Sequence, residues 1–504
     1  MGQKAVGRAS GRWRRRTSGL RSVKVGGSSR AQHRAVPVAQ TVAREPQAAL
    51  SEALLHRFDT PGPRYTSYPT ADRFVEAFGA VDTQRALRQR ATFGSPTPLS
   101  VYVHIPFCES LCYYCACNKI ITRHHERAAE YLDALETELD LVIDALGPEQ
   151  PVSQLHFGGG SPTFLSDAEL ARTLRALRAV LRFEPDIEMS IEVDPRTVTD
   201  ERLAHLRELG FNRISFGVQD FDPQVQIAVH RVQPYESVRD LMACARRLGF
   251  QSINADLIYG LPRQSARSFA RTVQQIGELR PDRIALYAYA HLPARFKPQR
   301  RIAAEQLPGA AQRVAMLGNA VGGLLAHGYT YIGMDHFALP GDALAVAKRQ
   351  GRLHRNFQGY STQPDCDLIG LGVSSIGRVG ATYYQNAKTL SEYYDALRQR
   401  QLPVARGFAL SRDDVVRRAV IMALMCQGWL EFESIELAHL VNVRSYFANE
   451  LQQLATFEEA GLVEIEDAGI RVTPAGWYVV RAIAMVFDRH LQADRARERF
   501  SRVI

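Results

Sequence analysis

The chain has 504 residues with 62 Lys and Arg against 53 Asp and Glu, a formal charge of +9, and 46% hydrophobic residues. This composition is typical of a globular protein with a large core, and the longest uninterrupted apolar run, residues 419–426, is far too short to span a bilayer. We therefore expect no membrane span, and seven cysteines are too few for a disulfide scaffold of this size.

The positive charge lies at the start of the chain. Residues 1–44 hold eleven basic residues and no acidic one, and the 51 basic and 53 acidic residues that remain give residues 45–504 a charge of about −2. Because this start has no periodic apolar pattern, residues 1–50 are predicted to be a disordered extension. A transit peptide and a start codon assigned too early are the alternatives. We expect a cytoplasmic protein without a nucleic-acid partner.

From Leu99 the chain alternates between short β-rich runs and amphipathic helices. One helix places leucines at spacings of three and four from Leu132 to Leu146, and another begins with a capping box at Ser166 and Glu169. Six such alternations indicate an α/β fold with a parallel sheet, curved or doubly wound. The predicted strands are residues 99–105, 154–157, 187–193, 213–218, 253–259 and 283–289.

The pattern changes after about residue 395. Residues 415–425 and 435–440 are predicted helices, residues 462–472 a hairpin, and a final helix follows from Pro474. This order resembles a small winged-helix module, which we place at residues 395–504 as a second, mostly helical domain. Its charge is mixed, so we do not expect it to bind DNA.

Four of the seven cysteines lie within ten residues, directly after the first predicted strand. Cys108, Cys112 and Cys115 have C-x3-C-x2-C spacing, and three thiolates on one tight loop can hold three irons of a [4Fe-4S] cluster while the fourth iron stays open. Structural zinc is the alternative, but zinc favours paired C-x2-C units from separated segments, and the sequence has no second pair.

This spacing is the signature of the radical S-adenosylmethionine superfamily, which the sequence resembles beyond the cysteines. The second predicted strand runs into Gly158, Gly159 and Gly160, which alone would most often form a turn, and Glu192 ends the third strand. The resemblance implies a partial (β/α)6 barrel over residues 99–394, against which residues 51–98 pack. It also implies that a cluster reduces S-adenosylmethionine to a 5′-deoxyadenosyl radical.

More specifically, residues 51–504 are similar to the family of oxygen-independent coproporphyrinogen III dehydrogenases. The similarity rests on motifs at residues 64–69, 102–118, 157–163, 216–221, 254–262, 289–293 and 359–376. It implies oxidative decarboxylation of two propionates of coproporphyrinogen III to vinyl groups, which gives protoporphyrinogen IX in heme biosynthesis. An electron donor and an electron acceptor, both unidentified, are implied as partners, and we expect a monomer.

The resemblance also implies roles for individual residues. Cys108, Cys112 and Cys115 match the cluster ligands, and Tyr102 and Cys117 are the catalytic candidates. The residues that match the site of the cluster-bound S-adenosylmethionine are Tyr102, Gly159, Glu192 and Ile376. Those that match a second S-adenosylmethionine are Tyr114, Gly160, Ser161, Gln219, Arg231, Asp256 and Ala290. The family commonly has Phe and Thr where Tyr114 and Ser161 stand. Cys117 is either a hydrogen-transfer thiol near the substrate or a packing neighbour of the cluster.

Two alternatives stay open at this point. The tetracarboxylate substrate needs basic side chains; the candidates, which could equally form a solvated loop, are Arg295, Lys297, Arg300 and Arg301. Heme-binding chaperones share the barrel without decarboxylase activity. They usually carry an aromatic residue at the position of Cys117 and lack a segment like residues 64–69, and both features favour the dehydrogenase here.

Overall fold

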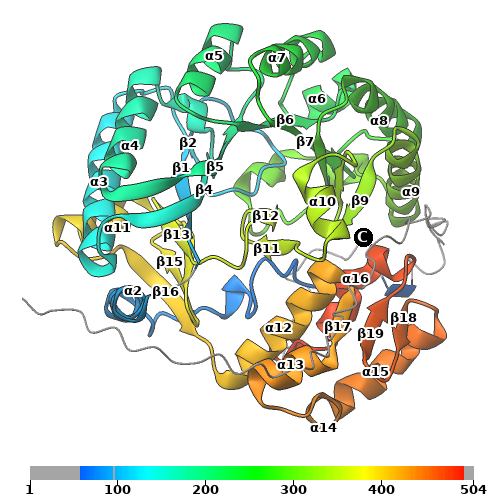
Figure 1. Cartoon of the computed structure of the whole chain (residues 1–504). Helices are drawn as coiled ribbons and strands as arrows, with labels where there is room; N and C mark the ends of the chain where they lie inside the picture. The colour runs from blue at the N-terminus through cyan, green and yellow to red at the C-terminus, as the bar shows by residue number, and fades with distance from the viewer. Residues whose placement is uncertain (1–56, 59, 95–96, 493–504) are drawn as a thin grey trace, which may run out of the picture. The chain divides into compact units, whose positions relative to one another are not determined.

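The computed structural model (Figure 1) describes residues 57–58, 60–94 and 97–492, all of which belong to one compact unit, Gln47–Ile504. The predicted extension at residues 1–50 lies outside the described residues. The domain boundary predicted at residue 395 stays a prediction. Within the described ranges, every helix is too short or too polar to cross a bilayer.

Six parallel strands form the middle of a twelve-stranded sheet, and each coincides with a predicted strand. They pair in chain order: β1 (Leu99–Ile105), β4 (Gln150–Gly159), β5 (Leu181–Val193), β6 (Arg213–Gln219), β7 (Ser252–Tyr259) and β8 (Arg283–Ala288). The connecting helices lie outside the strands (Figure 1): α3 (Arg127–Leu146), α4 (Asp167–Val180), α5 (Asp200–Glu208), α6 (Pro223–Ala228), α7 (Tyr235–Arg247) and α8 (Ala266–Leu279). The predicted (β/α)6 architecture is confirmed.

Helix α4 begins as the sequence predicts. Ser166 Oγ accepts from Glu169 N at 3.4 Å, and Glu169 Oε2 accepts from Ser166 N at 2.7 Å. We expect Ser166→Ala to lower the free energy of unfolding by about 1 kcal/mol, because an N-terminal amide of the helix loses its partner. Urea unfolding measures the change. The Ser166→Thr variant should keep most of the wild-type free energy of unfolding. Equal destabilisation by both substitutions would contradict the capping role.

The strands that extend the sheet at both edges are not among the predicted ones. β13 (Leu368–Leu371) runs parallel to β1, and antiparallel strands continue that edge: β14 (Ile376–Val379), β15 (Thr382–Asn386) and β16 (Val404–Ala409). At the other edge lie β10 (His336–Ala338) and β9 (Thr330–Gly333). These strands have three to six residues, too few for a periodic pattern to stand out.

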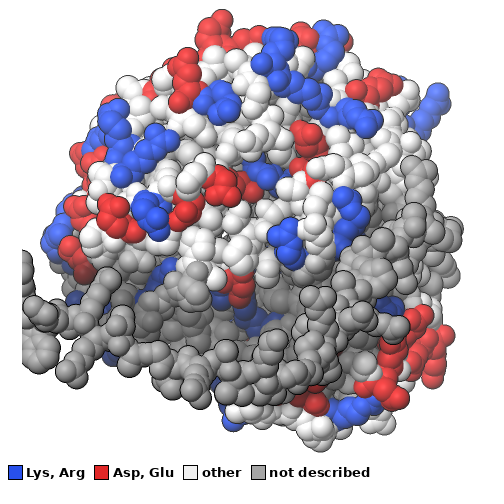
Figure 2. Space-filling view, viewed as in Figure 1, with Lys and Arg blue, Asp and Glu red and all other residues white. Residues whose placement is uncertain are grey.

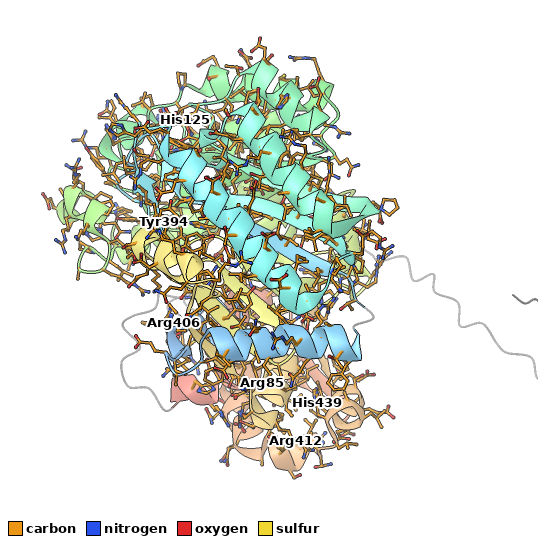
Figure 3. The ribbon with its side chains drawn as sticks, turned by 90° about the vertical axis from the view of Figure 1, so that its left-hand side faces the viewer. Arg85, His125, Tyr394, Arg406, Arg412 and His439 are labelled. Atoms are coloured by element: carbon orange, nitrogen blue, oxygen red, sulfur yellow. The ribbon has the colours of Figure 1, made fainter. Side chains whose placement is uncertain are left out.

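Several shorter elements complete the barrel. Helix α2 (Ala80–Phe93) lies across β14, β15 and β16 and beside α3 (Figure 3). The described residues also include α9 (Ala310–Ala326), α10 (Ala343–Arg349), α11 (Leu390–Arg398), β2 (Phe107–Cys108), β3 (Ile120–Ile121), β11 (His354–Asn356) and β12 (Gly359–Ser361). One-turn 3-10 helices lie at Ala71–Arg73, Pro162–Phe164, Lys297–Arg301, Ala304–Gln306 and Gly476–Val479.

The C-terminal part contains the predicted helices and the predicted hairpin. Its helices are α12 (Arg412–Gln427), α13 (Phe432–His439), α14 (Val443–Tyr446), α15 (Ala448–Glu459), α16 (Val480–Met485) and α17 (Arg489–Gln492). The hairpin strands are β18 (Val463–Ile465) and β19 (Gly469–Val472), and β17 (Trp429–Glu431), which was not predicted, makes a third strand beside β19. A three-stranded sheet with flanking helices agrees with the winged-helix arrangement.

The segment at residues 64–69 is part of the core. Tyr65 and Tyr68 are fully buried, and the Tyr65 hydroxyl donates to Asp488 Oδ2 at 3.0 Å. Residues 64–69 are therefore hydrogen-bonded to the end of the C-terminal part. Figure 2 shows Lys and Arg interspersed with Asp and Glu on the described part of one face, as the near-neutral charge of residues 45–504 predicts.

Candidate functional site

The loop that carries the cysteines follows β1 at the carboxyl edge of the parallel strands, and pairing of β2 with β3 closes it at its base. Tyr113 N donates to Val229 O at 3.0 Å, and the Tyr113 ring stacks on His230 with 5.1 Å between the centroids. The buried amide of Gln299 donates to Tyr114 O at 3.0 Å. Segments that follow α6 and β8 therefore hold the loop in place.

Two arginines face the thiol of Cys112. Arg196 Nη2 and Arg231 Nη1 each lie 3.5 Å from its Sγ. Asp194 holds both guanidinium groups, because its Oδ2 accepts from Arg196 Nη2 at 2.6 Å and from Arg231 Nη1 at 3.1 Å. The thiolate is the form that binds metal, and two guanidinium groups at this distance complement its negative charge. Asp194 and Arg196 are not among the site residues predicted from the sequence.

The other thiols of the loop influence one another. Burial raises the pKa of the Cys108 thiol to about 12, and negative charge on Cys115 and Cys112 acts in the same direction. A hydrogen bond from Cys117 lowers the pKa of Cys115 to about 5, with Lys119 contributing. Crowded thiols that oppose each other's ionisation are stabilised when metal cations lie between them. This donor set fits a [4Fe-4S] cluster.

A structural zinc site and an iron–sulfur cluster differ in how they use their donors. Among the residues that the structure describes, no three His, Cys, Asp or Glu side chains lie close enough together to hold a single metal ion. Structural zinc needs four ligands around one ion, whereas a cubane cluster takes each thiolate on a separate iron.

The glycines at the end of β4 allow the chain to lie close against the end of β1 and the start of the cysteine loop. A Cβ atom at Gly160 would lie 2.7 Å from Phe107 O, and one at Gly159 would lie 2.6 Å from the His104 ring. Gly159 also has a φ of +114°, a conformation that side chains disfavour. Ser161 N donates to Phe107 O at 2.8 Å. The glycine stretch is thus required by close packing against the cysteine loop.

Glu192, at the end of β5, is a charged group beside these glycines. Its Oε2 accepts from Gly159 N at 3.2 Å, and its Oε1 lies 3.3 Å from His156 Nε2. Burial opposes the charge, but the hydrogen bonds from His156 and Gly159 outweigh it and hold the pKa of Glu192 below its usual value. A carboxylate in this state can accept hydrogen bonds from ribose hydroxyls or from an amine.

A cavity of about 490 Å³ lies inside the barrel, which is a usual size for a cofactor or small-molecule site. Six residues that the sequence singled out line it: Tyr102, Cys117, Gly159, Glu192, Asp256 and Ile376. Burial, with the charge of Glu192 adding to it, raises the pKa of Asp256 to about 6. The structure thus gathers the residues predicted for the first S-adenosylmethionine, one predicted for the second, and Cys117.

The remaining residues predicted for the second S-adenosylmethionine do not line this cavity; they are Tyr114, Gly160, Ser161, Gln219, Arg231 and Ala290. Several of them lie around the cysteine loop. Arg231 Nη2 donates to Gly217 O at 2.6 Å, and a Cβ atom at Gly217 would lie 2.9 Å from both Arg231 and Gln219. Gln299 Nε2 donates to Ala290 O at 3.1 Å. A second S-adenosylmethionine at these positions stays a prediction.

The basic residues predicted to bind the substrate lie on the exposed loop after β8. Arg301 packs over Tyr113, with 5.3 Å between its guanidinium carbon and the ring centroid. Arg300 Nε donates to Pro293 O at 3.0 Å. None of the four basic residues lines the cavity: Arg295, Lys297, Arg300 and Arg301.

The polar interior of the barrel is not among the features predicted above, although the sequence carries a signal for it. Polar residues alternate with buried apolar ones along several parallel strands, as in Glu188, Ser190 and Glu192 of β5. Such alternation in a strand with two neighbours indicates that one face lines a polar space. The cavity walls are completed by polar residues at corresponding positions: Gln154, His156, Arg213, Ser215, Ser252, Asn254 and Arg283.

Comparison with known proteins identifies relatives of both parts of the chain. Residues 102–276 match the family model of the Radical SAM superfamily, and residues 410–479 match that of the HemN C-terminal domain. The oxygen-independent coproporphyrinogen III oxidase of Pseudomonas aeruginosa is 50% identical over 453 residues, which cover 90% of this chain and 98% of that protein. That of Escherichia coli is 47% identical over 452 residues with the same coverage.

A solved structure is similar over nearly the same range. It is described as "Coproporphyrinogen III oxidase (HemN) from Escherichia coli is a Radical SAM enzyme" and superposes with a TM-score of 0.83 at 46% identity. The match covers 87% of this chain and 99% of that one. Both the barrel and the C-terminal part therefore have a counterpart in one known fold.

Proposed function

This chain belongs to the family of oxygen-independent coproporphyrinogen III oxidases in the radical S-adenosylmethionine superfamily. From this premise we propose which of its residues bind the cofactors and which act on the substrate. It is an oxidoreductase of heme biosynthesis that uses a [4Fe-4S] cluster and S-adenosylmethionine. The observation that carries the proposal is the loop with three thiols beside a polar cavity lined by Tyr102, Cys117 and Glu192.

Two groups of residues hold the cofactors in this proposal. Cys108, Cys112 and Cys115 bind the cluster, and Arg196 and Arg231 lie beside the Cys112 sulfur. When bound, the cluster supplies one electron to S-adenosylmethionine and so provides a radical that abstracts hydrogen. The residues that hold this S-adenosylmethionine are Tyr102, Gly159, Glu192 and Ile376, all of which line the cavity.

The substrate is coproporphyrinogen III, and two of its propionates become vinyl groups. Each propionate loses one hydrogen atom from the carbon β to the carboxylate, then CO2 and one electron, as the carbon–carbon double bond forms. The reaction therefore needs an electron acceptor, and the cluster needs an electron donor. Cys117 lines the cavity, and this position supports the proposal that its thiol transfers hydrogen near the substrate.

Further parts of the proposal rest on the family motifs. We place a second S-adenosylmethionine at Tyr114, Gly160, Ser161, Gln219, Arg231, Asp256 and Ala290. We also infer a monomer in the cytoplasm. The acceptor and the donor are two distinct partners, since one takes electrons from the substrate and the other gives electrons to the cluster.

Anaerobic reconstitution with iron and sulfide, followed by an assay with S-adenosylmethionine, a reductant and coproporphyrinogen III, tests the function. We expect protoporphyrinogen IX, with loss of one CO2 per propionate that reacts. A protein that carries a full cluster, forms no product and binds one heme would instead be a heme chaperone. Omission of S-adenosylmethionine is the control and should abolish the product.

A further inference from the structure

The ring of Tyr113 connects the cysteine loop to the protein surface. Tyr113 follows Cys112 directly and precedes Cys115 by two residues, so it lies between two of the proposed cluster ligands. Its ring stacks on the exposed side chain of His230, whose Nδ1 donates to Leu111 O at 2.9 Å. Because the rate of electron transfer falls steeply with distance, this stacked pair is a favourable place for an electron to enter the loop.

The basic loop after β8 reaches the same ring. The Arg301 guanidinium lies over Tyr113, and its Nη1 is 3.5 Å from the Tyr113 hydroxyl. Ile302, the next residue, is buried in a small apolar cluster with Val225 and Val229, and Tyr113 packs against this cluster. Direct side-chain contacts therefore hold the basic loop, the cysteine loop and α6 together.

This loop carries an excess of positive charge. Four of the seven residues from position 295 to position 301 are cations and none is acidic. All four are exposed and none of them lines the cavity: Arg295, Lys297, Arg300 and Arg301. Across the part of the chain that the structure describes, none of the four forms an ion pair with an acidic side chain. The cysteine loop and the segment after residue 301 add one exposed acid each, Glu109 and Glu305, so the net charge stays positive and attracts an anionic partner.

Exposed apolar side chains lie beside these charges. Ile227 of α6 is 57% exposed, and Val232, just after the helix, is 59% exposed. His230 N donates to Ile227 O at 3.1 Å, so the apolar side chains come from the same turn as the ring that stacks on Tyr113. Electron-transfer complexes are weak and bury little surface, so a few apolar contacts inside a charged rim are enough to form one.

We propose that residues 295–301, with Tyr113, Ile227, His230 and Val232, form the docking surface for an acidic one-electron carrier protein that reduces the cluster. This inference rests on the proposed function, which needs an electron donor, and it names the chemistry of that donor and its binding site. The carrier gives up one electron in each encounter and leaves oxidised by one electron, and no proton or chemical group is transferred. Acidic residues around its redox centre meet the four cations and bring that centre toward Tyr113.

The test compares a protein donor with a small-molecule donor in the reconstituted holoenzyme. The probe is a plant-type [2Fe-2S] ferredoxin, a small acidic electron carrier, and dithionite is the small reductant. Isothermal titration calorimetry measures affinity, and stopped-flow absorbance measures reduction of the cluster. We expect Arg300→Glu and Arg301→Glu each to weaken ferredoxin binding and to slow reduction by ferredoxin roughly three- to tenfold. Ile227→Asp should act in the same direction, and added salt should slow the wild type more than the variants.

Dithionite separates docking from the other steps, because a small reductant needs no docking surface. With dithionite, the variants should match the wild type in cluster reduction, in turnover and in KM for coproporphyrinogen III. A raised KM in Arg300→Glu and Arg301→Glu under these conditions would assign the loop to the substrate and overturn the proposal. Arg301→Lys keeps the charge and should keep the rate of reduction by ferredoxin.

Helix α2, on the other side of the barrel from α6, supplies matched controls (Figure 1). Arg85, labelled in Figure 3, and Val81 are both exposed, so Arg85→Glu and Val81→Asp should change neither ferredoxin affinity nor the rate of reduction. If the charge-reversal variants accept electrons from ferredoxin as fast as the wild type does, the docking surface is wrong and the proposed function stands. The same holds if ferredoxin neither binds nor reduces a wild type that is active with dithionite. A wild type with a full cluster that forms no product with either donor would overturn the proposed function itself.

Discussion

A Cys112→Ser variant is expected to bind no stable [4Fe-4S] cluster and to lose all turnover. Cys112 is the most buried thiol of the loop, and its Sγ faces both Arg196 and Arg231 at 3.5 Å. A serine hydroxyl does not ionise at neutral pH, so the variant would replace an anionic ligand by a neutral one beside two guanidinium groups. Iron and acid-labile sulfide contents after anaerobic reconstitution, with the electron paramagnetic resonance signal of the reduced protein, measure the loss.

Two other cysteines give matched controls. Cys244 is buried on α7 away from the loop, so Cys244→Ser should keep the cluster and the activity. Cys117→Ser should keep the iron content but alter turnover, because Cys117 lines the cavity and is not one of the three proposed ligands. Full iron content in Cys112→Ser would contradict the ligand assignment. Loss of iron in Cys117→Ser would show that Cys117 supports the cluster itself.

The second large effect is expected at Glu138 of α3, a carboxylate that is 1% exposed. Its Oε2 accepts from Gly372 N at 2.7 Å and from the Tyr393 hydroxyl at 2.6 Å, and its Oε1 accepts from Asn386 Nδ2 at 2.5 Å. These bonds hold the turn that leads to Ile376 in the cavity wall. Glu138→Ala leaves Gly372 N and the Tyr393 hydroxyl without a partner and removes one of the acceptors of Asn386 Nδ2, so we expect the free energy of unfolding to fall by roughly 3–5 kcal/mol.

The same carboxyl should make stability depend on pH. Burial raises the pKa of Glu138 to about 7 from its usual 4.5, although its three hydrogen bonds act in the opposite direction. Because the folded state holds this proton more tightly than the unfolded state, the contribution is complete below pH 4.5 and is lost as the pH rises through 7. A difference of this size corresponds to roughly 3 kcal/mol.

Glu138→Gln isolates this titration, because an amide is neutral throughout the range. Relative to the wild type, the variant should gain roughly 2–3 kcal/mol in the free energy of unfolding between pH 5 and pH 8. Chemical unfolding at several pH values measures the difference. A constant difference across that range would show that Glu138 does not titrate there.

The sequence by itself determined the elements with local signals. The six parallel strands and the capping box at Ser166 follow from hydrophobic periodicity and from short-range hydrogen bonding, which depend on neighbours in the chain. The spacing of Cys108, Cys112 and Cys115 belongs to the same class, since one loop carries all three thiols. Family motifs added residues on the cavity wall, such as Glu192 and Ile376.

Only the tertiary structure decided which distant side chains meet. Arg196, just after β5, reaches Cys112, and Glu138 of α3 meets Asn386 of β15. The short strands from β9 to β16 depend on pairing with strands already in the sheet, so their own residues carry little signal. Contacts of this kind are set by the packing of elements far apart in the chain, which periodicity and spacing do not encode.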